Sequence, residues 1–263
     1  MELGIIARTW GEEPFAMAKA RGLSFLEYCV NVNSNYLDFE NASDAILDFS
    51  KKYGIKIGSI GRWGADKITP EGQIIEEELA LAYRYIDQCV KLGSPVYVTG
   101  CNYVEGLSYY QNITCAIAFF KKVVEYASGK GVKVALYNCD WNNFLCCDPA
   151  WDLILGEIPE LGIKFDPSHS RYGGRDYLAE LAKWVKRVYH VHIKGSLIID
   201  GKRFDDPPAG LDQTDWGSLM AVLYAGGYDG GLSIEPHSGV WLSGGLGESG
   251  VDYTVKYMKK LIF

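Results

Sequence analysis

Short apolar runs alternate with longer amphipathic stretches along the whole chain, a pattern typical of βα units built around a parallel sheet. Eight such pairs occur, and an amphipathic stretch follows each apolar run. In the clearest stretch, residues 176–188, Leu178, Leu181 and Val185 share one helical face, and Lys183 lies off that face. The predicted strands are residues 4–9, 25–30, 55–59, 96–99, 132–137, 163–166, 188–193 and 231–235.

Eight consecutive βα units in 263 residues match the size of one (β/α)8 TIM barrel, an α/β fold. No Pro/Ser-rich linker or change of composition divides the chain, so we expect a single domain over residues 1–263. An open doubly wound sheet is the alternative, because the number of strands alone does not show that a sheet closes. Helix-ending glycines are predicted before five of the strands, at Gly54, Gly93, Gly131, Gly162 and Gly227.

The segment of residues 195–214 is too long for an ordinary connection between a strand and its helix. Two short runs, residues 197–199 and 202–204, flank Asp200-Gly201, a pair that favours a two-residue turn with positive φ. We therefore expect a small hairpin at the mouth of the barrel. Its use as a substrate lid, a dimer contact or a decorated loop stays open.

Charge and composition narrow the choice of ligand. The chain has 26 Lys and Arg against 33 Asp and Glu, a net charge of −7, which argues against a nucleic-acid partner. No apolar run approaches the ~20 residues of a membrane span, and the first residues do not resemble an export signal, so we expect a cytoplasmic protein without a membrane partner. Seven cysteines without a C-x-x-C spacing predict neither a disulfide framework nor a zinc ribbon.

Metal-ligand side chains gather at the predicted strand ends of the last 100 residues. Alternation along residues 188–193 places His190 and His192 on the same side, and His192, nearer the end, is the better ligand. His190 is then expected one layer deeper, as a buried neutral imidazole with a hydrogen-bond partner. A carboxylate inside a barrel needs a cation or donor, which predicts a metal site. The full set is Asp166, His169, His190, His192, Glu235 and His237.

The segments IKFDPSHSRYGG, RVYHVHIKG and GLSIEPHS resemble the xylose-isomerase-like TIM-barrel superfamily, which includes the sugar phosphate isomerase/epimerase family. The resemblance implies a divalent metal ion, manganese first with magnesium or zinc as alternatives, held by Asp166, His192 and Glu235. It also implies that His169 contacts the substrate and that Glu235 acts as an acid or base.

One position departs from the family pattern. Tyr137, in VKVALYNCDW, stands where family members usually carry a glutamate on the fifth strand. An epimerase with two carboxylate bases therefore becomes doubtful. Asn138 or Asp140 could complete the metal shell, whereas Tyr137 could act as a catalytic proton donor or merely fill space.

Further substrate contacts are expected at the mouth. Trp10 and Trp63 end two strands and offer apolar surfaces for the C–H faces of a sugar. Lys194 and His237 follow His192 and Glu235 and are expected on the same face.

The function predicted first is a divalent-metal-dependent sugar isomerase or epimerase that acts on a keto-sugar or related polyol through an enediolate. A lyase or dehydratase acting on a sugar or cyclitol is the alternative, because elimination needs only one base. A non-catalytic sugar-binding barrel or subunit is the second alternative, favoured by Tyr137. The sugar, the reacting carbon, phosphorylation and assembly into a homo-oligomer stay open.

Overall fold

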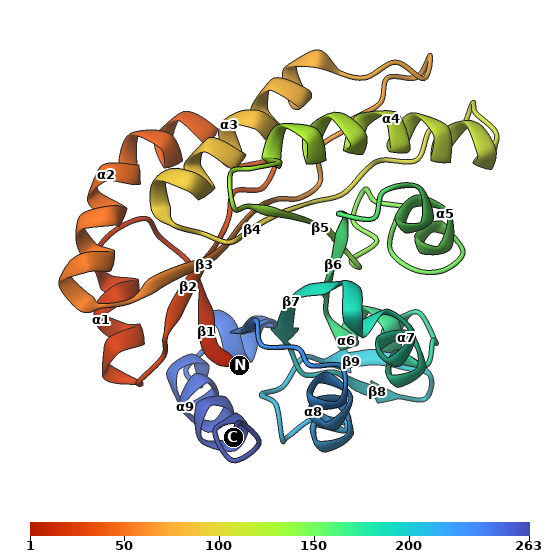
Figure 1. Ribbon diagram of the computed structural model, residues 1–263. Helices are drawn as coiled ribbons and strands as arrows, with labels where there is room; N and C mark the ends of the chain where they lie inside the picture. The colour runs from red at the N-terminus through yellow and green to blue at the C-terminus, as the bar shows by residue number, and fades with distance from the viewer.

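Eight parallel strands close into a barrel in the computed structural model, which describes residues 1–263 except for the side chain of Ser243 (Figure 1). The order around the barrel is β1-β10-β7-β6-β5-β4-β3-β2, so β1 and β10 join the two ends of the sheet. All eight predicted strands are confirmed, with ends that differ by up to three residues, and closure excludes the open sheet. The strands are β1 Glu2–Ala7, β2 Phe25–Cys29, β3 Lys56–Arg62, β4 Val96–Thr99, β5 Lys133–Tyr137, β6 Gly162–Phe165, β7 Val188–Ile193 and β10 Gly231–Ile234.

Helices surround the barrel and cover its apolar outer face (Figure 1). They bury side chains at helical spacing, such as Leu79, Ala82 and Ile86 of the third helix. The helices are α1 Glu13–Ala20, α2 Tyr36–Tyr53, α3 Glu76–Leu92, α4 Tyr109–Ala127, α5 Ala150–Glu157, α6 Pro167–Tyr172, α7 Tyr177–Trp184, α8 Trp216–Ala225 and α9 Gly247–Met258, with the short turns η1 Val185–Arg187 and η2 Gly239–Ser243. Among the helices that the structure describes, none combines the length and apolar character needed to cross a membrane.

The helix ends follow the predicted glycines only in part. Gly54 and Gly93 cap α2 and α3 with φ of 65° and 69°, the left-handed conformation that glycine adopts without strain. The predicted helix end at Gly162 is wrong, because α5 already ends at Glu157 and Gly162 opens β6.

The predicted hairpin is present between β7 and α8. Its strands β8 (Leu197–Ile199) and β9 (Lys202–Asp205) pair antiparallel across Asp200-Gly201. These two residues have φ of 50° and 71°, as a two-residue turn of the primed type requires.

The interior of the barrel has a charged half and an apolar half. Val96, Val98, Ala135 and Tyr137 of β4 and β5 pack with Trp63 into one apolar cluster. The interior side chains on β2, β6 and β7 and just after β6 include Glu27, Lys164, Asp166, His190 and His192, all buried.

The phenyl ring of Phe25 fills the bottom of the barrel. A Cβ atom added at Gly4 or Gly58 would lie 2.4 Å or 2.3 Å from this ring, so the ring fits because the neighbouring strands carry glycine. His190 packs against the ring from above, at 5.8 Å between centroids. Chemistry is therefore confined to the layers above Phe25, towards the carboxyl ends of the strands.

Candidate active site

Asp166 lies at the junction between β6 and α6 and has two unlike carboxylate oxygens. Oδ1 caps the helix by accepting hydrogen bonds from the Ser168 amide at 2.9 Å and the Ser168 hydroxyl at 2.7 Å. Oδ2 is buried and has no hydrogen-bond partner among the described residues. Burial alone would raise the pKa of Asp166, but Lys194 and His169 hold it below its ordinary value. A charged, unsatisfied oxygen therefore faces the barrel interior.

His192 and Glu235 bring two more ligand atoms to this oxygen. His192 Nδ1 lies 2.8 Å from Glu235 Oε2 and 3.8 Å from Asp166 Oδ2. The three ligand atoms are all within 4.8 Å of one another. Burial acts to raise the pKa of Glu235, but Lys194 and His192 outweigh it and place the pKa well below the ordinary value.

Glu27 of β2 fixes the orientation of His192 from the opposite side. Its carboxylate lies 2.9 Å from His192 Nε2 and 2.9 Å from His190 Nε2. Burial opposes the charge on Glu27, yet the two histidines lower its pKa well below the ordinary value. With a proton on His192 Nε2 held by this carboxylate, Nδ1, which faces Glu235 at 2.8 Å, is the nitrogen that can act as a ligand.

The sequence analysis missed Glu27, although it expected His190 to be buried with a hydrogen-bond partner, which the structure confirms. A signal was available, because Glu27 is the one charged residue in the apolar strand FLEYC. A carboxylate at an inward position of such a strand needs a donor in the same layer.

Lys194 and His169 form the upper part of the cluster. Lys194 Nζ lies 3.3 Å from Asp166 Oδ2 and 3.6 Å from Glu235 Oε2, and it donates a hydrogen bond to His169 Nε2 at 3.1 Å. Burial lowers the pKa of His169 to about 4, against the opposing effect of Asp166. His169 is therefore a neutral imidazole at pH 7.

These residues fit a divalent metal ion. One imidazole nitrogen and two carboxylates converge, and Asp166 Oδ2 supplies a negative atom that has no hydrogen-bond partner among the described residues and lies 3.3 Å from Lys194 Nζ. The carboxylate of Glu27 behind His192 is the second-layer contact that metal-binding histidines normally make. No cysteine belongs to this group of three.

The side chains at the end of β5 and just after it, Tyr137, Asn138 and Asp140, do not join this group of three ligands. Asn138 donates to the Asp166 carbonyl at 2.8 Å and accepts from the Asp166 amide at 2.9 Å, so its side chain ties β5 to β6. The Tyr137 hydroxyl donates to the Trp141 carbonyl at 3.1 Å and accepts from the Gly64 amide at 3.3 Å. Asp140 is exposed and lies near Cys139 and His169.

A pocket of about 320 Å³ opens above the cluster. Trp63 and Trp141 contribute to its wall, and His237 lies at its rim, 2.6 Å from Asp206 in the segment after the hairpin. Trp10 is not part of the lining, because its ring packs against Phe39 at 5.6 Å between centroids. The full lining is Ile6, Arg8, Cys29, Asn31, Trp63, Cys139, Trp141, Lys164, His169, His192, Lys194, Glu235, Pro236, His237 and Leu242.

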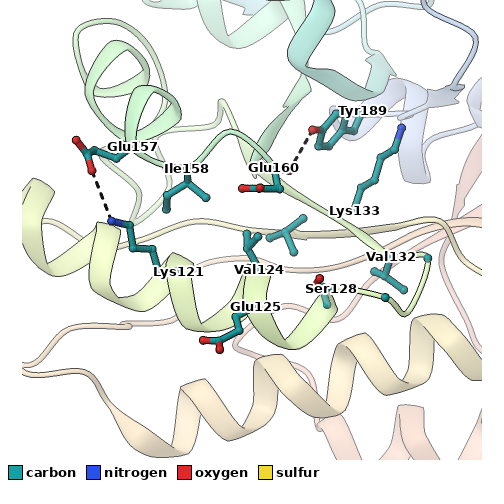
Figure 2. A pocket seen from close by; sticks show the side chains of 14 residues that line it. Lys121, Val124, Glu125, Ser128, Val132, Lys133, Glu157, Ile158, Glu160 and Tyr189 are labelled. Atoms are coloured by element: carbon teal, nitrogen blue, oxygen red, sulfur yellow. Dashed lines mark hydrogen bonds and ion pairs between the residues drawn. The ribbon is translucent and has the colours of Figure 1, made fainter.

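A larger cavity, of about 680 Å³, lies at the other end of the barrel between α4, α5 and the starts of β5 and β7 (Figure 2). Its charged side chains are spread along the rim, where Lys121 pairs with Glu157 at 3.5 Å and the Tyr189 hydroxyl donates to the Glu160 carbonyl at 3.0 Å. None of the groups of candidate metal ligands among the described residues lies there. Size alone therefore does not mark the active site.

The model of one protein family matches residues 15–261, nearly the whole chain, under the description xylose isomerase-like TIM barrel. The chain belongs to this family. An uncharacterised protein, YfiH of Bacillus subtilis (strain 168), is 27% identical to this family member over 147 residues, 48% of the chain. The match spans 47% of YfiH, about half of its length.

Solved structures of sugar epimerases share the fold of this xylose isomerase-like barrel. D-allulose 3-epimerase from Methylomonas sp., in complex with D-allulose, is 18% identical with a TM-score of 0.79, and the match covers 100% of this chain and 97% of the epimerase. The 3-keto-D-glucoside 4-epimerase YcjR from E. coli is 15% identical with a TM-score of 0.72, over 99% and 98% of the two chains. At these identities the similarity concerns the fold.

Proposed function

We propose that the chain is a divalent-metal-dependent sugar isomerase or epimerase that acts on a keto-sugar or related polyol. The observation that carries the proposal is the convergence of Asp166 Oδ2, His192 Nδ1 and Glu235 at the floor of the pocket. A divalent ion at this point, manganese in our proposal, would polarise adjacent carbonyl and hydroxyl oxygens and acidify the C–H bond between them. The epimerase activities named for the two solved structures support the same class of substrate.

Glu235 is the residue that we propose to move the proton. Its side chain is 22% exposed, unlike the fully buried Asp166, so it can reach a substrate in the pocket. Its lowered pKa keeps it ionised at neutral pH, as a general base requires. The neutral His169 accepts a hydrogen bond from Lys194 at Nε2 and is placed to hydrogen-bond a substrate oxygen. Trp63 and Trp141 supply apolar surface for the sugar and limit access of water.

Elimination is the second candidate, and the surroundings of Tyr137 favour it. The Tyr137 hydroxyl is engaged by Gly64 and Trp141, so this position at the end of β5 supplies no second base. One base suffices to remove a proton and expel a leaving group, or to transfer a proton between neighbouring carbons of one face. Epimerisation needs a proton delivered to the opposite face by another group.

Proton exchange with deuterated water tests this proposal. The Mn²⁺-loaded protein should catalyse exchange of a carbon-bound proton in at least one ketose, followed by NMR, and Glu235→Gln should lower the rate by about 10²-fold or more. Glu160→Gln, in the cavity of Figure 2, is the matched control and should retain full exchange. The product spectrum separates an isomer or epimer from a dehydrated sugar.

Metal analysis provides the independent arm of the test. His192→Ala and Glu235→Gln should each reduce the bound Mn²⁺, whereas His169→Ala should retain the ion and lose turnover. Undiminished metal in both ligand variants would remove the proposed site. A barrel that binds sugar without metal or exchange would instead support a non-catalytic sugar-binding protein.

A further inference from the structure

Lys164 is a buried cation without an adequate partner. It lies in the middle of β6 and is 1% exposed, and it belongs to the lining of the active-site pocket. Among the described residues none accepts a hydrogen bond from its Nζ, and the one carboxylate oxygen within 4 Å is Asp166 Oδ2 at 3.9 Å. Buried ammonium groups are costly unless they are paired and hydrogen-bonded. The geometry therefore leaves N–H donors of Lys164 available to a molecule in the pocket.

The position of Lys164 in the sheet links it to the unusual residue of β5. Lys164 is the direct neighbour of Tyr137 in the parallel ladder, and on its other side it is paired with His190. Residues paired in this way point to the same face of the sheet. The sequence resemblance implies a glutamate at this place in the barrel. The chain instead has Tyr137, whose hydroxyl hydrogen-bonds Gly64 and Trp141 and not the metal-ligand group, and Lys164 beside it.

A lysine and no glutamate at this place make the charge of the pocket more positive. Asp166 and Glu235 are the carboxylates at the floor, and Lys164 and Lys194 are the ammonium groups around them. Glu27 adds one negative charge in the layer below, where its close contacts are the two histidines of β7. A divalent ion bound by Asp166 and Glu235 would use their two negative charges. Glu27 would then offset only one of the two ammonium groups, and Arg8 adds a third positive group at the pocket wall, so the balance stays positive.

We propose that Lys164 binds an anionic group of the substrate, so that the pocket selects an acidic sugar, one carrying a carboxylate or a phosphate. The inference rests on the proposed function, since it concerns the substrate class of the same site. Lys164 is a binding residue in this proposal and takes no part in proton transfer. The pocket of about 320 Å³ lies within the range of small-molecule sites.

Isothermal titration calorimetry on the Mn²⁺-loaded protein tests the inference with ligands that differ in one group. D-gluconate carries a carboxylate where D-sorbitol carries a hydroxymethyl group. D-sorbitol 6-phosphate tests a phosphate in the same way. The wild type should bind at least one of the two anions about tenfold or more tightly than sorbitol, the value expected for one charge-assisted hydrogen bond. The tighter anion identifies the class of acid.

Substitution of Lys164 separates its effect from that of the metal ion, which can also attract a carboxylate. Lys164→Met keeps the length of the side chain without its charge, and it should lose about tenfold or more in affinity for the preferred anion and retain its affinity for sorbitol. Lys164→Gln provides a second neutral variant if the first does not fold, and the melting temperature reports folding for both. Lys133→Met, at an exposed position of β5, is the matched control and should retain the preference.

Two results would overturn the inference: a wild type that binds neither anion more tightly than sorbitol, or neutral Lys164 variants that keep the preference. Neither result depends on turnover. Anion-selective binding without proton exchange would contradict the proposed function alone, whereas exchange on neutral ketoses without any anion preference would contradict this inference alone.

Discussion

The Glu27 carboxylate accepts hydrogen bonds from the imidazoles of both histidines of β7, and its effect on metal binding can be measured. Glu27→Gln removes the negative charge behind both imidazoles and replaces one of the two accepting oxygens by an NH2 donor. We expect Mn²⁺ affinity to fall about 10- to 100-fold, as for other second-layer partners of a histidine ligand. Titration calorimetry with Mn²⁺ measures the change. Glu2→Gln, on the exposed start of β1, should bind Mn²⁺ like the wild type, and equal affinities in all three proteins would contradict the assigned role.

The contacts of Tyr137 in the structure favour a structural role for its hydroxyl over the catalytic role that its place in the sequence suggests. The departure from the family pattern predicts that Tyr137→Phe lowers turnover far more than binding, because the phenol would then be a catalytic acid. In the structure the hydroxyl joins Gly64 to Trp141, burial raises its pKa above the ordinary value, and the ring stacks on Trp63 at 5.4 Å. We expect Tyr137→Phe to change turnover by less than about fivefold and to cost about 1 kcal/mol of stability.

Steady-state kinetics and urea unfolding measure these two effects. Tyr97→Phe is the matched control, because Tyr97 is equally buried and its hydroxyl has no hydrogen-bond partner among the described residues. It should unfold at the wild-type urea concentration or above. A loss of more than 10²-fold in turnover for Tyr137→Phe, with unchanged stability, would return the phenol to the reaction.

Sequence reasoning identified the side chains at strand ends better than those in the interior. Asp166, His192 and Glu235 could be grouped because the carboxyl ends of parallel strands meet at one face. Glu27 and Lys164 could not be paired with partners in this way. The contact between Glu27 and His190 joins residues 163 positions apart, and it depends on the register that closes the barrel.

At the level of elements, the pattern of the chain predicted the strands and the hairpin but not every boundary. Each buried strand is a short apolar run, and Asp200-Gly201 is among the turn signals that act through local backbone preference alone. The predicted end of a helix at Gly162 failed because α5 stops at Glu157, where Ile158 and not a glycine occupies the cap position. The short helix α6 was missed because Pro167 and the cap at Asp166 follow the strand directly.

The hairpin is held to the mouth of the barrel by Asp206. Its carboxylate contacts Arg203 of β9, Tyr172 of α6 and His237, which follows β10. Burial opposes the charge, yet the hydrogen bonds from these neighbours lower the pKa of Asp206 to about 2. The carboxylate is therefore charged at all ordinary pH values and anchors three segments of the chain.

Loss of this charge should loosen the hairpin. We expect Asp206→Asn to speed amide hydrogen exchange in β8 and β9 about tenfold, because charge-assisted hydrogen bonds become weaker neutral ones. Hydrogen exchange followed by mass spectrometry measures the rate in the peptide that contains β8 and β9. Asp200→Asn, in the exposed turn of the same hairpin, is the control, since asparagine also tolerates positive φ. Equal exchange in the two variants would show that the hairpin is held by other contacts.

Closure of the barrel is the property of the whole molecule on which the site depends. The ladders between β1 and β10 and between β1 and β2 bring Glu27 opposite the histidines of β7, although β2 and β7 lie far apart in the sequence. The same closure creates an interior in which a buried charge depends on partners of opposite charge. Folding stability and the geometry of the active site therefore both depend on buried ionic contacts.

A second buried ionic cluster tests this dependence away from the site. Glu78 of α3 accepts hydrogen bonds from Arg62 Nε at 2.8 Å and Lys67 Nζ at 2.7 Å, and it fastens the loop after β3 to the first turn of α3. Lys67 is 1% exposed, so its charge has little access to water. Removing the shared anion leaves two buried cations unpaired. Glu78→Gln should therefore destabilise the protein at pH 7 by about 3–5 kcal/mol.

The pH dependence of this loss has a definite sign. Burial raises the pKa of Glu78, but Arg62 and Lys67 outweigh it, so the pKa in the folded state lies below the ordinary value of 4.5. A carboxyl group of this kind adds stability that is fully present above the unfolded pKa and is lost as pH falls through the folded one. Urea unfolding should thus show a difference between wild type and Glu78→Gln that is constant from pH 6 to 8 and shrinks below about pH 4.5. Glu77→Gln, exposed on the same helical turn, should show little difference at any pH. A Glu78→Gln difference that grows towards acid pH would mean that the folded protein holds this carboxyl group protonated, and the two cations would then be stabilised by something other than its charge.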